Sequence, residues 1–302
     1  MNKTDNLKGA AYSVLSALSV SLVYILSKIA QNHLATDIFL FWWFGFGSLW
    51  GTFVILKMNT VKKYYKILKK NILFLGYFAI AEAFATFLFF YLIKQMNPSV
   101  VSFLGSIGPM IIVILGYFIL KEKLNLTEGI GGLIALSGLI IITWTTPDIS
   151  LENLLILFTM MLIYSLNTIL VRKHSEKIPS FMITALRLYF LFLSYTVFVL
   201  VKGSFVLPNK QEFLVLLIGS LAGPVLGMYF LFKALSYTKA VTVSIIKSVQ
   251  PFIVAIETYL FLNLPITFKQ LIGGTILVIG INIILFASKV DIRSFISRPV
   301  KN

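Results

Sequence analysis

The sequence contains seven stretches of about 20 apolar residues without a charged side chain, and this length matches the roughly 20 residues that a helix needs to cross a bilayer core. These stretches are 9–27, 38–56, 95–120, 129–147, 153–171, 213–232 and 270–288. Three further windows, 71–93, 179–201 and 240–262, are equally apolar but carry internal charges. The pattern predicts an all-α integral membrane protein with ten transmembrane helices.

The overall composition agrees with a membrane protein. Of 302 residues, 58% are hydrophobic and 12% are charged, whereas soluble proteins carry about 25% charged residues. The net charge of +15 raises the alternative of a nucleic-acid partner. However, the densest basic run, 57–70, lies between two apolar stretches, where Lys and Arg set orientation and meet anionic lipid. We therefore expect a lipid bilayer and no nucleic acid as partner.

The chain has no Cys and two His, which argues against a zinc site, an iron–sulfur cluster or a thiol nucleophile. We expect neither a metal nor a cofactor. The sequence contains no HExxH, no GxSxG and no phosphate-binding GxxxxGK[ST] loop. These absences argue against an enzyme and against an ATP-driven pump.

The connecting segments predict the orientation, because loops on the cytoplasmic side carry more Lys and Arg. If the N-terminus is inside, nineteen basic residues fall on the cytoplasmic side and five on the outer side. We therefore expect a multi-pass protein of the cell membrane with both termini in the cytoplasm.

An internal repeat becomes visible when the chain is shifted by 142 residues. PSVVSFLGSIGPMIIVILGYFIL (98–120) then lies on AVTVSIIKSVQPFIVAIETYLFL (240–262) without a gap. The match continues into the next helix, where Gly131 and Gly138 pair with Gly273 and Gly280. We expect a first five-helix repeat at 1–147, a second at 148–289 and a basic cytoplasmic tail at 290–302.

A repeat unit of five helices is odd, so its second copy enters the membrane from the opposite side and the repeat is inverted. Inverted repeats are a recurrent plan of secondary transporters, whose substrate sites lie near the midplane between the repeats. The leading hypothesis is therefore a secondary transporter, an exporter or exchanger, of a small polar or amphipathic metabolite such as an amino acid or a related compound. A flippase for a lipid-linked substrate is the main alternative on the same scaffold.

Several motifs resemble the EamA family of the drug/metabolite transporter superfamily. They are a Pro in the middle of the fourth and ninth helices (GSIGP, KSVQP), the stretch FILKEKLNLTEGIGGLIALSGLII, the lead-in ALSYTKAVTVS and the Arg of TALR. The resemblance spans nearly the whole chain. It implies a metabolite or drug carrier of the plasma membrane, often an exporter, driven by an ion gradient or by exchange.

Charged side chains inside predicted membrane helices are candidate functional residues, because each costs about 2.5 to 3.5 kcal/mol at a helix centre. Glu82 is a candidate proton carrier, since a buried carboxyl binds protons more readily, or it pairs with a basic residue of another helix. Lys247 and Arg187 are candidates for holding a carboxylate or phosphate of the substrate. Either could instead neutralise a buried acid.

Other candidates come from their position on the predicted helices. Gln250 and Glu257 share a face of the ninth helix, with Lys247 about one turn below Gln250. Glu257 lies nearer the outer end and is either a gate or an interfacial residue. Pro109 and Pro251 each remove a backbone donor at matching depths, which indicates a substrate site or a packing kink.

Three further residues complete the predicted substrate site. Tyr24 and Trp43 combine a flat apolar face with a hydrogen-bonding tip. Asn167 is a polar residue in the sixth helix, where it either lines the cavity or joins two helices.

Overall fold

The computed structural model describes residues 3–58, 71–108, 110–111, 114–115, 126–146, 149–174, 180–238 and 240–296. Over these residues it contains helices and no strand, which confirms the predicted all-α fold class. Within the described ranges, the helices form ten segments at the positions of the ten predicted membrane spans. Eight of them, within the described residues, are long and apolar enough to cross a membrane.

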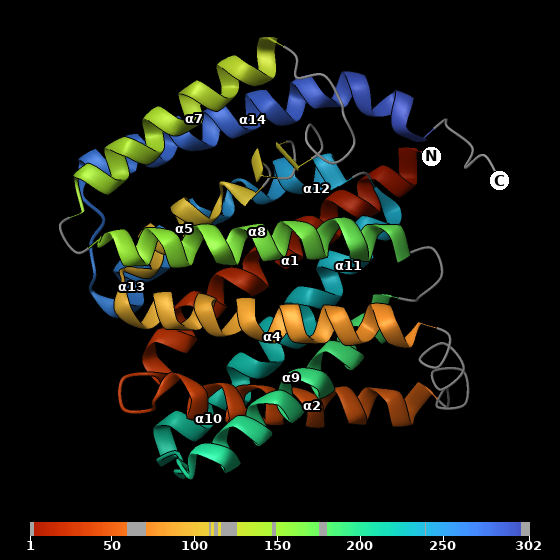
Figure 1. Cartoon of the computed structure of the whole chain (residues 1–302), viewed down its shortest axis with the longest axis vertical. Helices are drawn as coiled ribbons and strands as arrows, with labels where there is room; N and C mark the ends of the chain where they lie inside the picture. The colour runs from red at the N-terminus through yellow and green to blue at the C-terminus, as the bar shows by residue number, and fades with distance from the viewer. Residues whose placement is uncertain are drawn as a thin grey trace.

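The first half of the chain contributes five helical segments. They are α1 (Lys3–Ala30), α2 (Thr36–Met58), α4 (Ile72–Gln95), α5 (Pro98–Gly105) and α7 (Leu126–Trp144). The second half contributes α8 (Leu151–His174), α9 (Ser180–Lys202), the continuous segment of α10 (Lys210–Ser220), η1 (Leu221–Gly227) and α11 (Met228–Tyr237), then α12 (Ala240–Lys247) with α13 (Gln250–Leu262), and α14 (Phe268–Ile296). The described ends of α1 and α14 nearest the termini lie at the same end of the bundle (Figure 1).

Polar side chains set where several helices begin. Asn97 accepts a hydrogen bond from the backbone N–H of Ser99, and Pro98 occupies the first turn of α5. Asn209 and Glu212 form a reciprocal capping box at the start of α10. Each cap satisfies backbone donors that a helix start leaves without partners.

One predicted span differs from a regular helix. The window 213–232 lies within α10–η1–α11, whose central part is a π-helix containing Pro224. Proline has no backbone N–H and disturbs the preceding turn, which explains the local change of hydrogen-bond pattern. Such π-helical turns are frequent at functional sites.

The packing of α7 against α14 shows the repeat directly. A Cβ atom added at Gly138 would collide with the backbone of Leu277 and Gly273. A Cβ atom added at Gly280 would collide in the same way with the backbone of Ala135 and Gly131. These two residues lie 142 positions before Leu277 and Gly273, the residues that Gly138 meets. Small residues allow two membrane helices to approach this closely. The reciprocal contact is what an inverted repeat requires.

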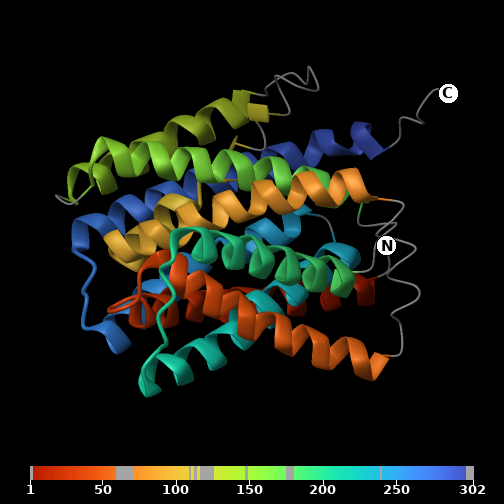
Figure 2. The ribbon, with the colours of Figure 1, turned by 60° about the horizontal axis from the view of Figure 1, so that its bottom comes forward.

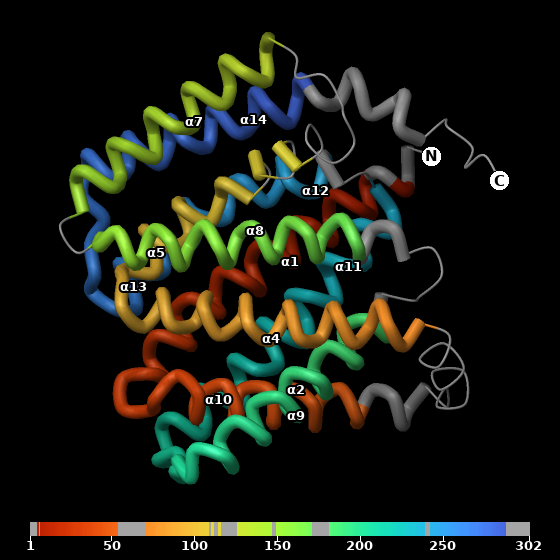
Figure 3. Tube along the Cα trace, in the orientation of Figure 1, coloured from red at the N-terminus to blue at the C-terminus, as the bar shows by residue number. Residues whose placement is uncertain are grey.

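The remaining helices surround α1, which packs mainly against the second half. Figure 1 and Figure 2 show α2 and α9 side by side at one end of the molecule, and α7 with α14 at the other. Figure 3 follows the chain through α5 and α13, which contact each other between these two helix pairs. Residues 147 and 148 lie outside the described residues, so the division of the repeats at that point stays a prediction.

Candidate functional site

The described part of the chain encloses a cavity of about 420 Å³ in the middle of the bundle. Its lining comes from both halves of the chain, and it includes residues of α1, α2, α4, α5, α8, α9 and the helices from η1 to α14. This volume falls within the range of about 300 to 1,000 Å³ that is typical of small-molecule sites. The cavity therefore lies where a substrate site between inverted repeats is expected.

Two interrupted helices form part of the cavity wall. In the first half, α5 ends at Gly105 and a turn follows at Ser106. In the second half, α12 ends at Lys247, a turn follows at Ser248, and α13 begins at Gln250. The two breaks are 142 residues apart, and all five of these residues line the cavity. The internal repeat therefore places its two helix breaks at one site.

The predicted Pro positions flank these breaks. Pro251 lines the cavity in the first turn of α13. Pro109 lies outside the described residues. The assignment of both residues as helix breaks for substrate binding or gating stays a prediction.

A buried ion pair connects three of the predicted site residues. Arg187 Nε of α9 donates to Glu82 Oε1 of α4 at 2.5 Å. Asn167 Nδ2 of α8 donates to the second carboxylate oxygen, Oε2, at 3.0 Å. All three side chains are buried, and the guanidinium also lies 5.7 Å from the ring centre of Phe44. Both oxygens of Glu82 are therefore engaged by protein donors.

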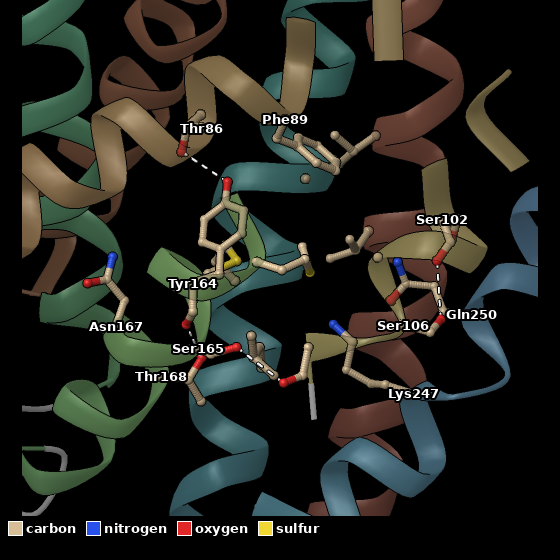
Figure 4. Close-up of a pocket in the computed structure, with 18 of the residues that line it drawn as sticks. Thr86, Phe89, Ser102, Ser106, Tyr164, Ser165, Asn167, Thr168, Lys247 and Gln250 are labelled. Atoms are coloured by element: carbon tan, nitrogen blue, oxygen red, sulfur yellow. Dashed lines mark hydrogen bonds between the residues drawn. The ribbon is translucent and has the colours of Figure 1, made fainter. Parts of the chain in front are cut away.

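Lys247 has a different environment. Its Nζ lies 3.4 Å from Ser16 Oγ, and no ion pair to it occurs among the described residues. Gln250, which begins α13 after the break, is buried. Figure 4 shows Lys247 and Gln250 on one side of the cavity, with Asn167, Tyr164 and Thr168 on the opposite side. The lysine amine points toward the space between them (Figure 4).

Aromatic rings form the apolar part of the lining. The rings of Tyr24 and Phe89 meet edge to face with 5.2 Å between their centres. The rings of Trp43 and Phe90 also meet edge to face, with 5.9 Å between their centres. Edge-to-face contacts of this kind hold rings in fixed orientations. Gly223 makes room for this wall, because a side chain there would collide with Val23.

The structure thus brings seven predicted substrate-site residues to one cavity: Tyr24, Trp43, Glu82, Asn167, Arg187, Lys247 and Gln250. It places Glu257 elsewhere. Glu257 does not line the cavity and accepts a hydrogen bond of 2.9 Å from Ser21 of α1. The roles of these residues in binding or gating are still predictions.

Sequence reasoning missed other lining residues. Tyr164 and Ser165 of α8 lie on the cavity wall, where Tyr164 is within 3.3 Å of Thr86 and Ser165 donates to the Gly108 carbonyl. Hydroxyl residues are common in membrane helices, so their type alone gave no signal. Pro224 also lines the cavity, and a Pro after Gly223 inside a predicted span could have marked this position.

The apolar helices and the central cavity define a polytopic membrane protein built from two repeats around one cavity. Comparison of the sequence with family models gives a match to the EamA-like transporter family over residues 7–144 and again over residues 152–286. The chain therefore belongs to the EamA-like transporter family, a family of membrane transporters within the drug/metabolite superfamily.

Comparison with individual proteins adds evidence on the fold alone. No curated protein matches the chain. A solved structure described only as the crystal structure of a protein is similar, with a TM-score of 0.67 and 16% sequence identity. The similarity covers 96% of this chain and 100% of the other. At this identity the likeness extends to the arrangement of the helices.

Proposed function

We propose that this protein is a secondary transporter, an exporter or exchanger, that moves a small amphipathic metabolite across the cell membrane by alternating access. The observation that carries the proposal is the cavity at two helix breaks related by the repeat. Inverted repeats support alternating access, because two equivalent halves can exchange their conformations around a fixed central site.

The orientation proposed from the basic loops gives the cavity a direction. Its lining reaches Phe78 near the start of α4, Thr168 near the end of α8 and Leu235 near the end of α11. These helix ends would face the cytoplasm. The arrangement supports an inward-facing state, in which the substrate is loaded from or released to the cytoplasm.

Contacts at the opposite end of the bundle support the same state. Lys28 Nζ donates to the carbonyls of Lys94 and Met96, at 2.7 and 3.1 Å, and Lys94 Nζ donates to the carbonyl of Leu34 at 2.8 Å. These bonds tie the α1–α2 connection to the turn between α4 and α5. We propose that they close the outer side of the cavity.

Two single-cysteine variants test the orientation, because the native chain contains no Cys. Gln211 and Ser236 are exposed and lie near opposite ends of the α10–η1–α11 span. We expect Gln211→Cys to react with a membrane-impermeant thiol reagent added outside intact cells. Ser236→Cys should react only after the membrane is opened, and the reverse pattern would contradict the proposed orientation.

A cavity-filling variant tests the transport function. Gly105 lines the cavity, and a Cβ atom there would meet only the methyl group of Met161 at 3.9 Å. Gly129 is exposed on α7 with open space around it, so Gly129→Trp is a matched control. We expect cells that produce the native protein to differ in their metabolite pools from cells without it. Gly105→Trp should abolish that difference at equal membrane abundance, and Gly129→Trp should preserve it.

Uptake into proteoliposomes then identifies the cargo. The metabolite whose pool changes most should accumulate in vesicles with the native protein and not in vesicles with Gly105→Trp. Equal pools in all strains would contradict the transport proposal. Movement of a lipid-linked compound between leaflets, without release into the vesicle lumen, would favour a flippase.

A further inference from the structure

Resting on the proposed transport function, we propose that the cavity selects a monocarboxylate with a flat apolar body and that Lys247 binds its carboxylate. The inference concerns the charge class of the substrate, which membership of the transporter family leaves open. It predicts that an organic monoanion binds better than a zwitterion or a cation of the same size and shape.

The charged side chains around the cavity leave one positive charge without a counter-charge. Three charged side chains line it among the described residues: Glu82, Arg187 and Lys247. Glu82 and Arg187 form an ion pair, so their charges cancel. Among the described residues, Lys247 is left with the hydroxyl oxygen Oγ of Ser16 as its polar partner, at 3.4 Å. An unbalanced charge within a membrane protein is unfavourable, and a bound monoanion would neutralise it.

Among the described residues, the cavity offers no free carboxylate to an ammonium group, and Asn167 Oδ1 is its buried neutral acceptor without a partner. Glu82 Oε1 accepts from Arg187 and Oε2 accepts from Asn167, so this carboxylate is already occupied. No other acid lines the cavity among the residues that the structure describes. A zwitterionic substrate would therefore bring a positive charge that only dipoles could stabilise. A cationic substrate would in addition be repelled by Lys247.

The charge of the cavity also favours a carboxylate over a phosphate. A phosphate monoester carries between one and two negative charges near neutral pH. One uncompensated lysine balances one negative charge, so a dianion would leave excess charge in a low-dielectric site. Arg187 Nη1 is buried and has no hydrogen-bond partner among the described residues, but the charge of the guanidinium is already balanced by Glu82. It can add a hydrogen-bond donor without changing the charge that the cavity prefers.

The neighbouring side chains fit the rest of such a molecule. Gln250 is buried on the same wall as Lys247, and its amide can donate to a carboxylate oxygen. Phe89 lies across the cavity from Lys247 in Figure 4, and it packs against Tyr24. A flat apolar body can stack on these rings while its carboxylate meets the lysine. The site thus combines one anionic subsite with an aromatic one.

Three compounds that share one skeleton test the charge selection. They are 3-phenylpropionate, which is a monoanion, phenylalanine, which is a zwitterion, and 2-phenylethylamine, which is a cation. Binding to the purified full-length protein in detergent is measured by the shift of its thermal unfolding midpoint, since a ligand that binds the folded state stabilises it. We expect 3-phenylpropionate to bind at least about tenfold more tightly than either of the others.

Variants of Lys247 connect this preference to one residue. Lys247→Gln should weaken 3-phenylpropionate binding by about tenfold or more, because the carboxylate loses its counter-charge. Lys269→Gln, on an exposed lysine at the outer start of α14, should leave binding unchanged. Lys247→Glu should reverse the order and favour 2-phenylethylamine. A normal unfolding transition without ligand shows that each variant is folded.

The inference is overturned if phenylalanine or 2-phenylethylamine binds as tightly as 3-phenylpropionate, or if folded Lys247→Gln binds 3-phenylpropionate normally. It is also overturned if none of the three compounds stabilises the native protein. These results would leave the transport function standing, because the comparison of metabolite pools with Gly105→Trp tests that function without assuming the charge of the cargo.

Discussion

At the helix break of the first half, the cavity wall carries Gly105 and Gly108, whereas the equivalent positions of the second half carry Lys247 and Gln250. The backbone is the same in both places: a short helix ends, two residues form a turn, and a helix resumes. The contact between α7 and α14 is different, because there the two halves match in both backbone and side chains, with Gly138 equivalent to Gly280.

The two halves of the repeat therefore have glycine at the same positions of the α7–α14 contact but different side chains at the cavity wall. Close helix packing needs glycine on both sides, so both copies keep it. Both breaks form the cavity wall, but only the second carries a charged side chain, Lys247, to which we assign the proposed monoanion. The symmetric backbone therefore builds the site, and the asymmetric side chains give it a chemical preference.

The largest expected effect comes from Glu82, the acid of the buried ion pair beside the cavity. Glu82→Gln leaves Arg187 buried without a counter-charge, and loss of one partner of a buried pair costs about 3–5 kcal/mol. We expect a clear fall of the thermal unfolding midpoint in detergent. Glu152→Gln removes an exposed carboxylate of α8 and should change the midpoint little. The double variant Glu82→Gln/Arg187→Gln should recover part of the loss.

The same variant decides between the two roles predicted for Glu82. If Glu82 carries a coupling proton, Glu82→Gln should fold normally and bind substrate but lose accumulation driven by a pH gradient. The hydrogen bonds to both carboxylate oxygens favour the counter-ion role. A stable Glu82→Gln protein with this selective loss would contradict the expected instability.

An intermediate effect is expected at the symmetric contact. Gly138→Ala and Gly280→Ala each place a Cβ atom against backbone of the facing helix, and overpacking of this kind costs about 1–3 kcal/mol. The two variants should lower the unfolding midpoint by similar amounts, because their surroundings are related by the repeat. Gly76→Ala, where the added atom meets nothing within 4 Å, is the control. Unequal losses at Gly138 and Gly280 would show that the packing is less symmetric than the repeat requires.

The smallest effect is expected on substrate affinity, when the positive charge is moved from Lys247 to the equivalent position, Gly105, of the first half. Lys247→Gly should lower the affinity for 3-phenylpropionate by about tenfold, or about 1.4 kcal/mol. Adding Gly105→Lys moves the positive charge to the equivalent place in the other half, where the backbone has room for a side chain. We expect the double variant to recover part of the lost affinity in the thermal-shift assay. No recovery in a folded double variant would mean that the two walls are not equivalent for the substrate.

The sequence by itself predicted the membrane helices and the internal repeat. Backbone groups in a bilayer have no water to bond, so each crossing must be a helix of apolar residues, and this requirement is visible in local composition. Gapless pairing at 142 residues predicted that helix breaks at Pro109 and Pro251 belong together, and the structure has the equivalent breaks at Gly105 and Lys247, four residues earlier. Residues that the sequence analysis named on those helices, Lys247 and Gln250, line one cavity with the first break, and their role in binding stays a prediction.

Only the tertiary structure decided which polar groups meet. Glu82 could have paired with Lys247 or with Arg187, and the chain distance of 105 residues to Arg187 gave no preference. The structure pairs Glu82 with Arg187 and Asn167, directs Glu257 to Ser21, and leaves Lys247 beside the cavity. The physical reason is that membrane insertion depends on the polarity of each segment, whereas ion pairing depends on how the helices rotate and pack against one another.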